Sequence, residues 1–148
     1  MHRRSIPLLT LLLAAAVAGS ASASSRSTAS FCSVSKSVAV QLVNTANAVK
    51  SSATLAQRQA ELKTQFTTIR SAEGSLKTRV PGTLKTKLNT VLAFVNLVSA
   101  KLTAVHWNIA ALAQNPSVAA AIEAASARAD VAIPALKTYY RNTCHFKI

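Results

Sequence analysis

The fold is decided by residues 84–105, which read LKTKLNTVLAFVNLVSAKLTAV. The large apolar side chains of this stretch recur at alternating steps of four and three residues: Leu84, Leu88, Val91, Val95, Val98, Leu102 and Val105. That spacing is the period of an α-helix with one buried stripe. Leu92 and Phe94 widen the stripe, whereas the lysines and asparagines lie off it. We therefore expect a central helix that packs against several neighbours without crossing a membrane.

Residues 1–23 have the three parts of a secretory signal peptide. Arg3 and Arg4 give a basic start, residues 6–18 are largely apolar, and small residues lead to a cleavage site after Ala23. The apolar run is shorter than the roughly 20 residues that a membrane span requires. The sequence therefore predicts cleavage and export, with an uncleaved membrane anchor as the alternative.

The remainder of the chain has the length of one domain with one hydrophobic core. Residues 24–30 contain no bulky apolar side chain, so we expect a disordered leader there and a helical domain over residues 31–148. The whole sequence has 17 Lys and Arg against 4 Asp and Glu, a formal net charge of +13. Such a surplus favours anionic partners and says nothing about the fold.

The sequence contains two cysteines, Cys32 and Cys144, one near each end of the predicted domain. In an exported protein the first expectation is a disulfide bond between them, because the extracellular environment is oxidising. Two free thiols or an intermolecular bridge are the alternatives. A bond closing so long a loop would contribute stability comparable to that of a whole small domain, about 5 kcal/mol in the chain-entropy model.

Helical periodicity predicts three further helices around the central one. The first spans residues 31–50, and the second begins at Leu55, where Thr54 and Gln57 have the spacing of a capping box. Pro81 ends the second helix and could occupy the first turn of the central one. Pro116 fits the first turn of a last helix, which Pro134 should kink or divide.

Short connections between four helices predict an all-α, up-down-up-down bundle. In that topology the start of the first helix and the end of the fourth lie at the same end of the bundle. Cys32 and Cys144 occupy those two positions, so the helix count and the cysteine positions support each other.

Residues that could perform catalysis or bind a metal are few. Outside the signal peptide there are four carboxylates, Glu61, Glu73, Glu123 and Asp130, and two histidines, His106 and His145. We find no nucleophile motif, no glycine-rich phosphate loop and no metal-ligand spacing. The sequence therefore predicts a protein that is not an enzyme and needs neither cofactor nor metal.

The densest basic region lies on the second predicted helix and around the turn after it. It contains Lys63, Arg70, Lys77, Arg79, Lys85 and Lys87. If the turn brings these side chains together, an anionic envelope polymer or lipid headgroups would bind them with a strong dependence on salt. The alternative is a solvated face whose long side chains cover the edge of the core. A specific nucleic-acid target is not expected, because aromatic residues for base stacking are few.

An apolar or haem-like ligand held between the helices is a second hypothesis. Four aromatic side chains could line such a pocket: Phe66, Phe94, Trp107 and Tyr139. Bundle interiors are common sites for ligands of this kind. Aromatic residues at helical spacing are, however, ordinarily part of the core.

Phe31-Cys32 at the start of the first helix, an alanine- and threonine-rich helical body, and Thr143-Cys144 after the last helix resemble small secreted helical proteins of actinobacteria. The resemblance covers Phe31 to Cys144. It implies a bundle and an exported location, and it carries over no functional residues. The sequence thus favours a secreted, non-catalytic bundle that binds a polyanion, with a ligand carrier as the alternative.

Overall fold

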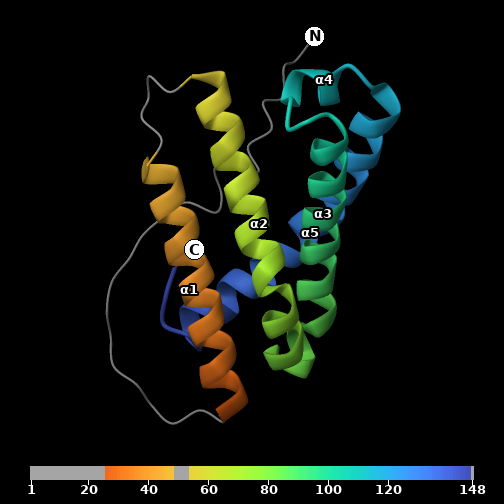
Figure 1. Cartoon of the computed structure of the whole chain (residues 1–148). Coiled ribbons are helices and arrows are strands. Elements are labelled where there is room, and N and C mark those ends of the chain that lie inside the picture. The colour runs from red at the N-terminus through yellow and green to blue at the C-terminus, as the bar shows by residue number, and fades with distance from the viewer. Residues whose placement is uncertain (1–25, 49–53, 148) are drawn as a thin grey trace.

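A computed structural model describes residues 26–48 and 54–147; the predicted signal peptide lies outside these ranges. Its elements are α1 (Arg26–Ala48), α2 (Leu55–Arg79), the 3₁₀ turn η2 (Gly82–Leu84), α3 (Lys85–Ala104), α4 (Ile109–Ala113) and α5 (Pro116–Asn142). The four long helices run alternately up and down (Figure 1). The predicted all-α bundle is confirmed, with α4 as an additional short helix before α5. No helix within the described ranges is long and apolar enough to span a membrane.

Local capping chemistry sets the helix starts that the sequence predicted. The capping box of α2 is present: the Gln57 N–H donates to Thr54 Oγ1 at 3.2 Å, and the Thr54 N–H donates to Gln57 Oε1 at 2.7 Å. Pro116 is the first residue of α5, and the side chain of Asn115 caps that helix by accepting a bond from the Val118 N–H. Both starts depend on neighbouring residues alone, so they are readable from the sequence.

Three details differ from the sequence-based expectations. Residues 26–30, expected in a disordered leader, belong to α1, because extending an existing helix through Ser, Thr and Ala requires no further apolar burial. Pro81 precedes the 3₁₀ turn rather than opening α3, since its extended ψ of 142° interrupts the helical path. Helix α5 continues through Pro134, so of the two expected outcomes, a kink or a division, the division is excluded.

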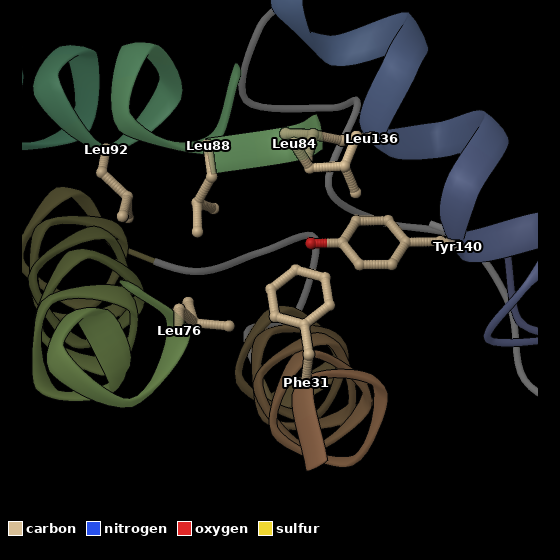
Figure 2. Close-up of a cluster of buried hydrophobic side chains, with 7 residues drawn as sticks. All are labelled: Phe31, Leu76, Leu84, Leu88, Leu92, Leu136 and Tyr140. Carbon is tan, nitrogen blue, oxygen red and sulfur yellow. The ribbon is translucent and has the colours of Figure 1, made fainter. Parts of the chain in front are cut away.

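The core consists of two clusters stacked along the bundle. The lower cluster draws on all four long helices and contains Phe31, Leu76, Leu84, Leu88, Leu92, Leu136 and Tyr140 (Figure 2). The upper cluster contains Leu62, Phe66, Val95, Val98 and Leu102 from α2 and α3, with Trp107, Leu112 and Ile122 packed against it. Helix α3 supplies buried residues to both clusters, as its apolar stripe predicted. Val91, expected in that stripe, is only half-buried, whereas Leu92 is almost fully buried.

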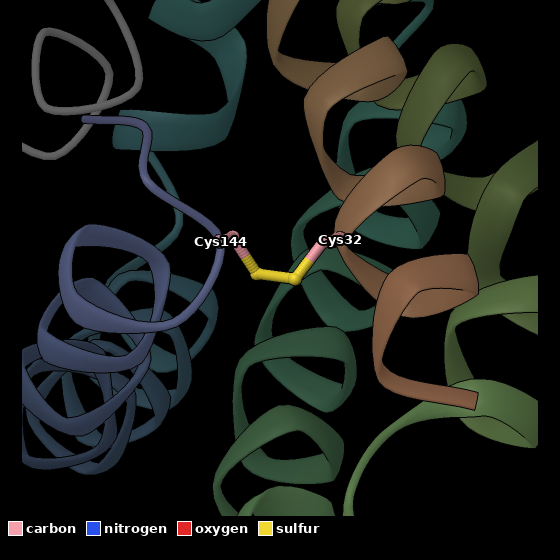
Figure 3. The surroundings of a disulfide bond; sticks show 2 residues. All are labelled: Cys32 and Cys144. Atoms are coloured by element: carbon pink, nitrogen blue, oxygen red, sulfur yellow. A yellow bond between two sulfur atoms is a disulfide. The ribbon is translucent and has the colours of Figure 1, made fainter. Parts of the chain in front are cut away.

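Contacts between helices follow the order of the chain: α1 packs along α2, α2 along α3, and α3 along α5. On the remaining side of the bundle, the predicted disulfide bond between Cys32 and Cys144 connects α1 to the chain that follows α5, with a Cα–Cα distance of 5.2 Å (Figure 3). Beside the bond, Phe31 stacks on Tyr140 with ring centroids 5.9 Å apart. We call the end of the bundle that holds this bond and the α2–α3 turn the cysteine end.

Removing the disulfide should destabilise the fold without changing its helix content at low temperature. We expect the Cys32→Ser/Cys144→Ser variant to lose about 2–4 kcal/mol of unfolding free energy, because the unfolded chain is no longer restricted by a closed loop. Urea unfolding followed by circular dichroism measures the difference. An unchanged midpoint in urea would show that helix packing alone fixes α1 against α5.

Candidate polyanion-binding surface

The structure does not bring all six basic residues proposed from the sequence together. Lys63 lies two heptads before Lys77 on α2, about 21 Å away along the helix axis at 1.5 Å per residue. It therefore lies next to the upper cluster and not at the cysteine end. Arg79, the last residue of α2, is close in sequence to Lys85 and Lys87 at the start of α3.

Arg70 and Lys77 take part in a polar network between α2 and α3. Arg70 Nη1 donates to the hydroxyl of Ser99 at 3.4 Å. The carboxylate of Glu73 forms an ion pair with Lys77 and accepts a hydrogen bond of 2.9 Å from Asn96 Nδ2. These two cations therefore interact with side chains of the bundle itself, and their contribution to an external ligand is reduced.

The same contacts stabilise the ionised form of Glu73. Hydrogen bonds from Lys77 and from Asn96 lower the pKa of this carboxyl below its ordinary value of 4.5, and partial burial opposes them. The positive charges of Lys77 and Arg70 act in the same direction as the hydrogen bonds. Glu73 is thus ionised throughout the physiological pH range and neutralises part of the nearby positive charge.

Helix α5 and its C-terminal tail bring further cations to the cysteine end. Arg141 lies in the last turn of α5, Lys137 lies one turn earlier, and Lys147 belongs to the tail. The α2–α3 turn, the end of α5 and the tail all contribute residues to the lower cluster or border it, and we call the six cations on these segments the basic end: Arg79, Lys85, Lys87, Lys137, Arg141 and Lys147. Lys87 and Lys137 are half-buried, and the other four are exposed. No described ion pair joins any of the six to a carboxylate.

The sequence-based prediction of the site omitted the three cations of α5 and the tail. The up-and-down topology predicted from the same sequence nevertheless implies that they lie near the α2–α3 turn. A four-helix up-and-down bundle places the end of the last helix beside the turn between the second and third. Lys137, Arg141 and Lys147 were therefore predictable neighbours of that turn. They were overlooked because they are separated from it by a long stretch of chain.

Aromatic stacking and backbone geometry fix the position of the tail. Phe146 stacks on Tyr140 with ring centroids 5.1 Å apart, and its N–H donates to the Tyr140 carbonyl at 3.1 Å. His145 adopts a left-handed backbone conformation, with φ 56°, that turns the chain back toward the bundle. The disulfide at Cys144 anchors the same segment. Lys147 consequently follows an anchored residue.

Tyr140 is the most deeply buried titratable group of the cysteine end. Burial raises the pKa of its phenol, and the nearby Ser35 hydroxyl opposes this shift. The Ser35 hydroxyl is itself buried and does not reach the geometry of a hydrogen bond with any partner. Tyr140 therefore remains neutral at physiological pH and acts as a packing residue under the basic end.

The four aromatic residues of the carrier hypothesis are divided between the two core clusters. Phe66 lies 6.0 Å from Trp107, centroid to centroid, and Phe94 packs against the same upper cluster. Tyr139 instead contacts Phe31 edge-on in the lower cluster, at 6.1 Å. The structure thus does not bring all four side chains to one pocket.

The two histidines lie at opposite ends of the bundle (Figure 1). His106 is exposed in the turn after α3, where it and Trp107 adopt positive φ values of 51° and 64°. His145 belongs to the tail at the cysteine end. Among the residues that the structure describes, no group of three or more His, Cys, Asp or Glu side chains could hold a metal ion.

The chain matches no protein-family model, no curated protein and no solved structure.

Protonating Glu73 should weaken the contact between α2 and α3. A carboxyl whose pKa is lower in the folded than in the unfolded state stabilises the fold above its unfolded pKa, and that contribution is lost as the pH falls through the folded value. We expect the wild type to lose stability below about pH 4.5 more steeply than Glu73→Gln. Urea unfolding between neutral pH and pH 3 measures both profiles.

Glu123→Gln is the matched control, because this exposed side chain makes no described hydrogen bond or ion pair. It should retain the wild-type profile in acid. Parallel profiles for the wild type and Glu73→Gln would show that the network contributes nothing to the acid response.

Proposed function

We propose that the mature chain is a secreted, non-catalytic protein that binds an anionic polymer of the cell envelope or extracellular space through the basic end. The observation that carries this proposal is that six cations lie on the end of α2, the start of α3, the end of α5 and the tail, whose apolar residues pack in or against the same lower cluster. The signal-like residues 1–23 and the Cys32–Cys144 disulfide support the extracellular location.

The distribution of carboxylates strengthens the proposal. Glu73, the acidic side chain closest in sequence to the end of α2, is paired with Lys77. Glu61 lies in the first half of α2, and Glu123 and Asp130 lie in the first and middle parts of α5. The positive field is therefore concentrated at the cysteine end, where it attracts an anionic ligand and accelerates its association.

The lysines at the start of α3 occupy positions that local stability does not favour. The N-terminus of a helix carries partial positive charge, so a cation in the first turn is unfavourable by about 0.3–1 kcal/mol. Helix α3 has Lys85 and Lys87 there, no acidic residue, and no side-chain cap. Natural chains tend to break such local rules at functional positions, which supports a binding role for these lysines.

Neutralising the basic end should weaken binding to sulfated or phosphorylated polymers. We expect the Lys85→Gln/Lys87→Gln/Arg141→Gln variant to elute from a heparin column at clearly lower salt than the wild type. Each lost contact between a cation and the polymer also reduces the slope of log affinity against log salt by about one.

The Lys63→Gln/Lys101→Gln/Arg128→Gln variant is the control. It removes the same charge from positions outside the basic end. Equal losses in the two variants would mean that net charge, and not this surface, governs retention. Wild-type protein that does not bind any polyanion at physiological salt would refute the proposal.

Replacing Lys85 by Glu should separate stability from binding. The new carboxylate would interact favourably with the positive end of α3, so we expect thermal stability to increase by about 0.3–1 kcal/mol. Polyanion affinity should fall at the same time, because the variant places a negative charge in the basic end. Thermal unfolding and heparin retention measured on the same preparation test both effects, and a gain in stability without loss of retention would place the ligand elsewhere.

A further inference from the structure

The outward face of α5 is apolar along its centre. Helix α5 packs along α3 and contacts α4 (Figure 1), and its buried residues lie on the side that faces the bundle: Ala125, Ala129, Ala132, Leu136 and Tyr140. Exposed residues recur on the opposite side at alternating steps of four and three positions. We call these residues the outer stripe: Ala120, Ala124, Ala127, Val131 and Pro134. The outer stripe is therefore apolar where an exposed helix face ordinarily carries polar and charged side chains.

The outer stripe contains the large apolar side chain with the greatest exposure in the described part of the chain. Val131 is 73% exposed, compared with 49% for Val40 of α1. The alanines and the proline continue the apolar surface on both sides of Val131 along the helix. A contiguous exposed apolar face of this kind is characteristic of a protein-interaction surface.

The spacing of the outer stripe is that of a coiled-coil seam. Ala124 and Val131 occupy heptad position a, and Ala120, Ala127 and Pro134 occupy position d. Because all five residues are exposed, no described segment of the chain covers them. A seam of this kind fits a second helix with the same spacing, and α5 of a second copy provides one, since a two-fold axis brings the same surface of both subunits together.

Two charged residues on opposite flanks of the outer stripe identify the partner. Glu123 precedes Ala124 at position g, and Arg128 follows Ala127 at position e, the positions whose charges set partner choice and orientation in coiled coils. Both side chains are exposed, and neither forms a described hydrogen bond or ion pair. In a parallel pair of helices, position g of one lies beside the position e that follows five residues later on the other. Two parallel copies of α5 therefore place Glu123 of each beside Arg128 of the other.

An antiparallel pair of the same helices is less well matched in charge. In the register that packs Ala127 against Val131 of the second copy, Glu123 gains Lys137 as a neighbour at each end of the seam. At the centre, however, Arg128 lies beside Arg128 and Asp130 beside Asp130, and like charges in contact are unfavourable. The parallel pair contains no like-charged contact, because positions 135 and 142, which lie beside Asp130 and Lys137, are alanine and asparagine.

We infer that α5 is a dimerisation helix through which two copies of the chain associate in parallel about a two-fold axis, with their outer stripes in contact. The outer stripe extends over about 21 Å at 1.5 Å per residue, so the interface is at the small end of specific interfaces. The dimer is therefore weak and reversible, with an expected Kd of about 0.01–1 mM. Its formation does not require a polyanion.

Sedimentation velocity of the disulfide-bonded protein at physiological salt, at concentrations up to about 1 mM, measures the association. We expect the mean sedimentation coefficient of the wild type to rise with concentration toward that of a dimer. Val131→Glu should raise the dimer Kd at least about tenfold, because it brings two carboxylates together at the centre of the seam. The same substitution lowers the net positive charge, so overall repulsion between basic chains cannot cause the loss.

Val40→Glu is the matched control, because it makes the same change at an exposed valine of α1. It should dimerise like the wild type. A wild type that remains monomeric up to about 1 mM would overturn the dimer, and so would a Kd that Val131→Glu leaves unchanged.

Exchanging the flanking charges tests the orientation. Arg128→Glu should raise the Kd about fivefold, because each Glu123 then lies beside a second carboxylate. Glu123→Arg/Arg128→Glu should restore the wild-type Kd, since it forms both ion pairs with their signs exchanged. A dimer that Val131→Glu dissociates and the charge exchange does not restore would overturn the parallel arrangement in favour of an antiparallel one. Each of these results leaves the proposed function standing, because the six cations of the basic end lie outside the outer stripe.

Discussion

The contact between Phe31 and Tyr140, beside the Cys32–Cys144 bond, links two pairs of helices that otherwise interact through α2 and α3. Helix α1 packs along α2 and helix α5 along α3, so the position of α1 relative to α5 depends strongly on this region. Phe31 is completely buried, and its ring contacts Tyr139 edge-on and stacks on Tyr140. Burial of one large aromatic side chain and one covalent bond therefore close the fourth side of the bundle.

The fold was largely predictable because its determinants are local or periodic. Three of these determinants depend on residues within a few positions of one another: the stripe of α3, the capping box at Thr54 and the proline at the start of α5. The disulfide was predictable for a different reason: with two cysteines, an exported chain has one intramolecular pairing. The start of α1 was not, because Ser- and Ala-rich residues can extend a helix or remain disordered at similar free energy.

The candidate site was predicted less well, because its membership depends on how the helices are rotated and paired. Heptad spacing indicated that Arg70 and Lys77 share a face of α2, but not that Ser99 and Asn96 of α3 lie opposite that face. Basic side chains on one helix can therefore bind side chains of the bundle or an external ligand. Which of the two they bind depends on the side chains that the neighbouring helix places opposite them. Arg141 and Lys147, in contrast, belong to the basic end because the order and direction of the helices place the end of α5 and the tail there.

The spacing of the two cysteines has a consequence for the order of events during synthesis of the chain. They are separated by 112 positions, and Cys144 follows the last helix. A chain that emerges from its N-terminus exposes Cys32 long before its partner, whereas the α2–α3 hairpin can form as soon as both helices are present. The disulfide is thus a late event that requires the whole stretch from α1 to the end of α5. Until Cys144 is present, Cys32 lacks its partner, and a chain that stops short of Cys144 can form a disulfide only with another molecule.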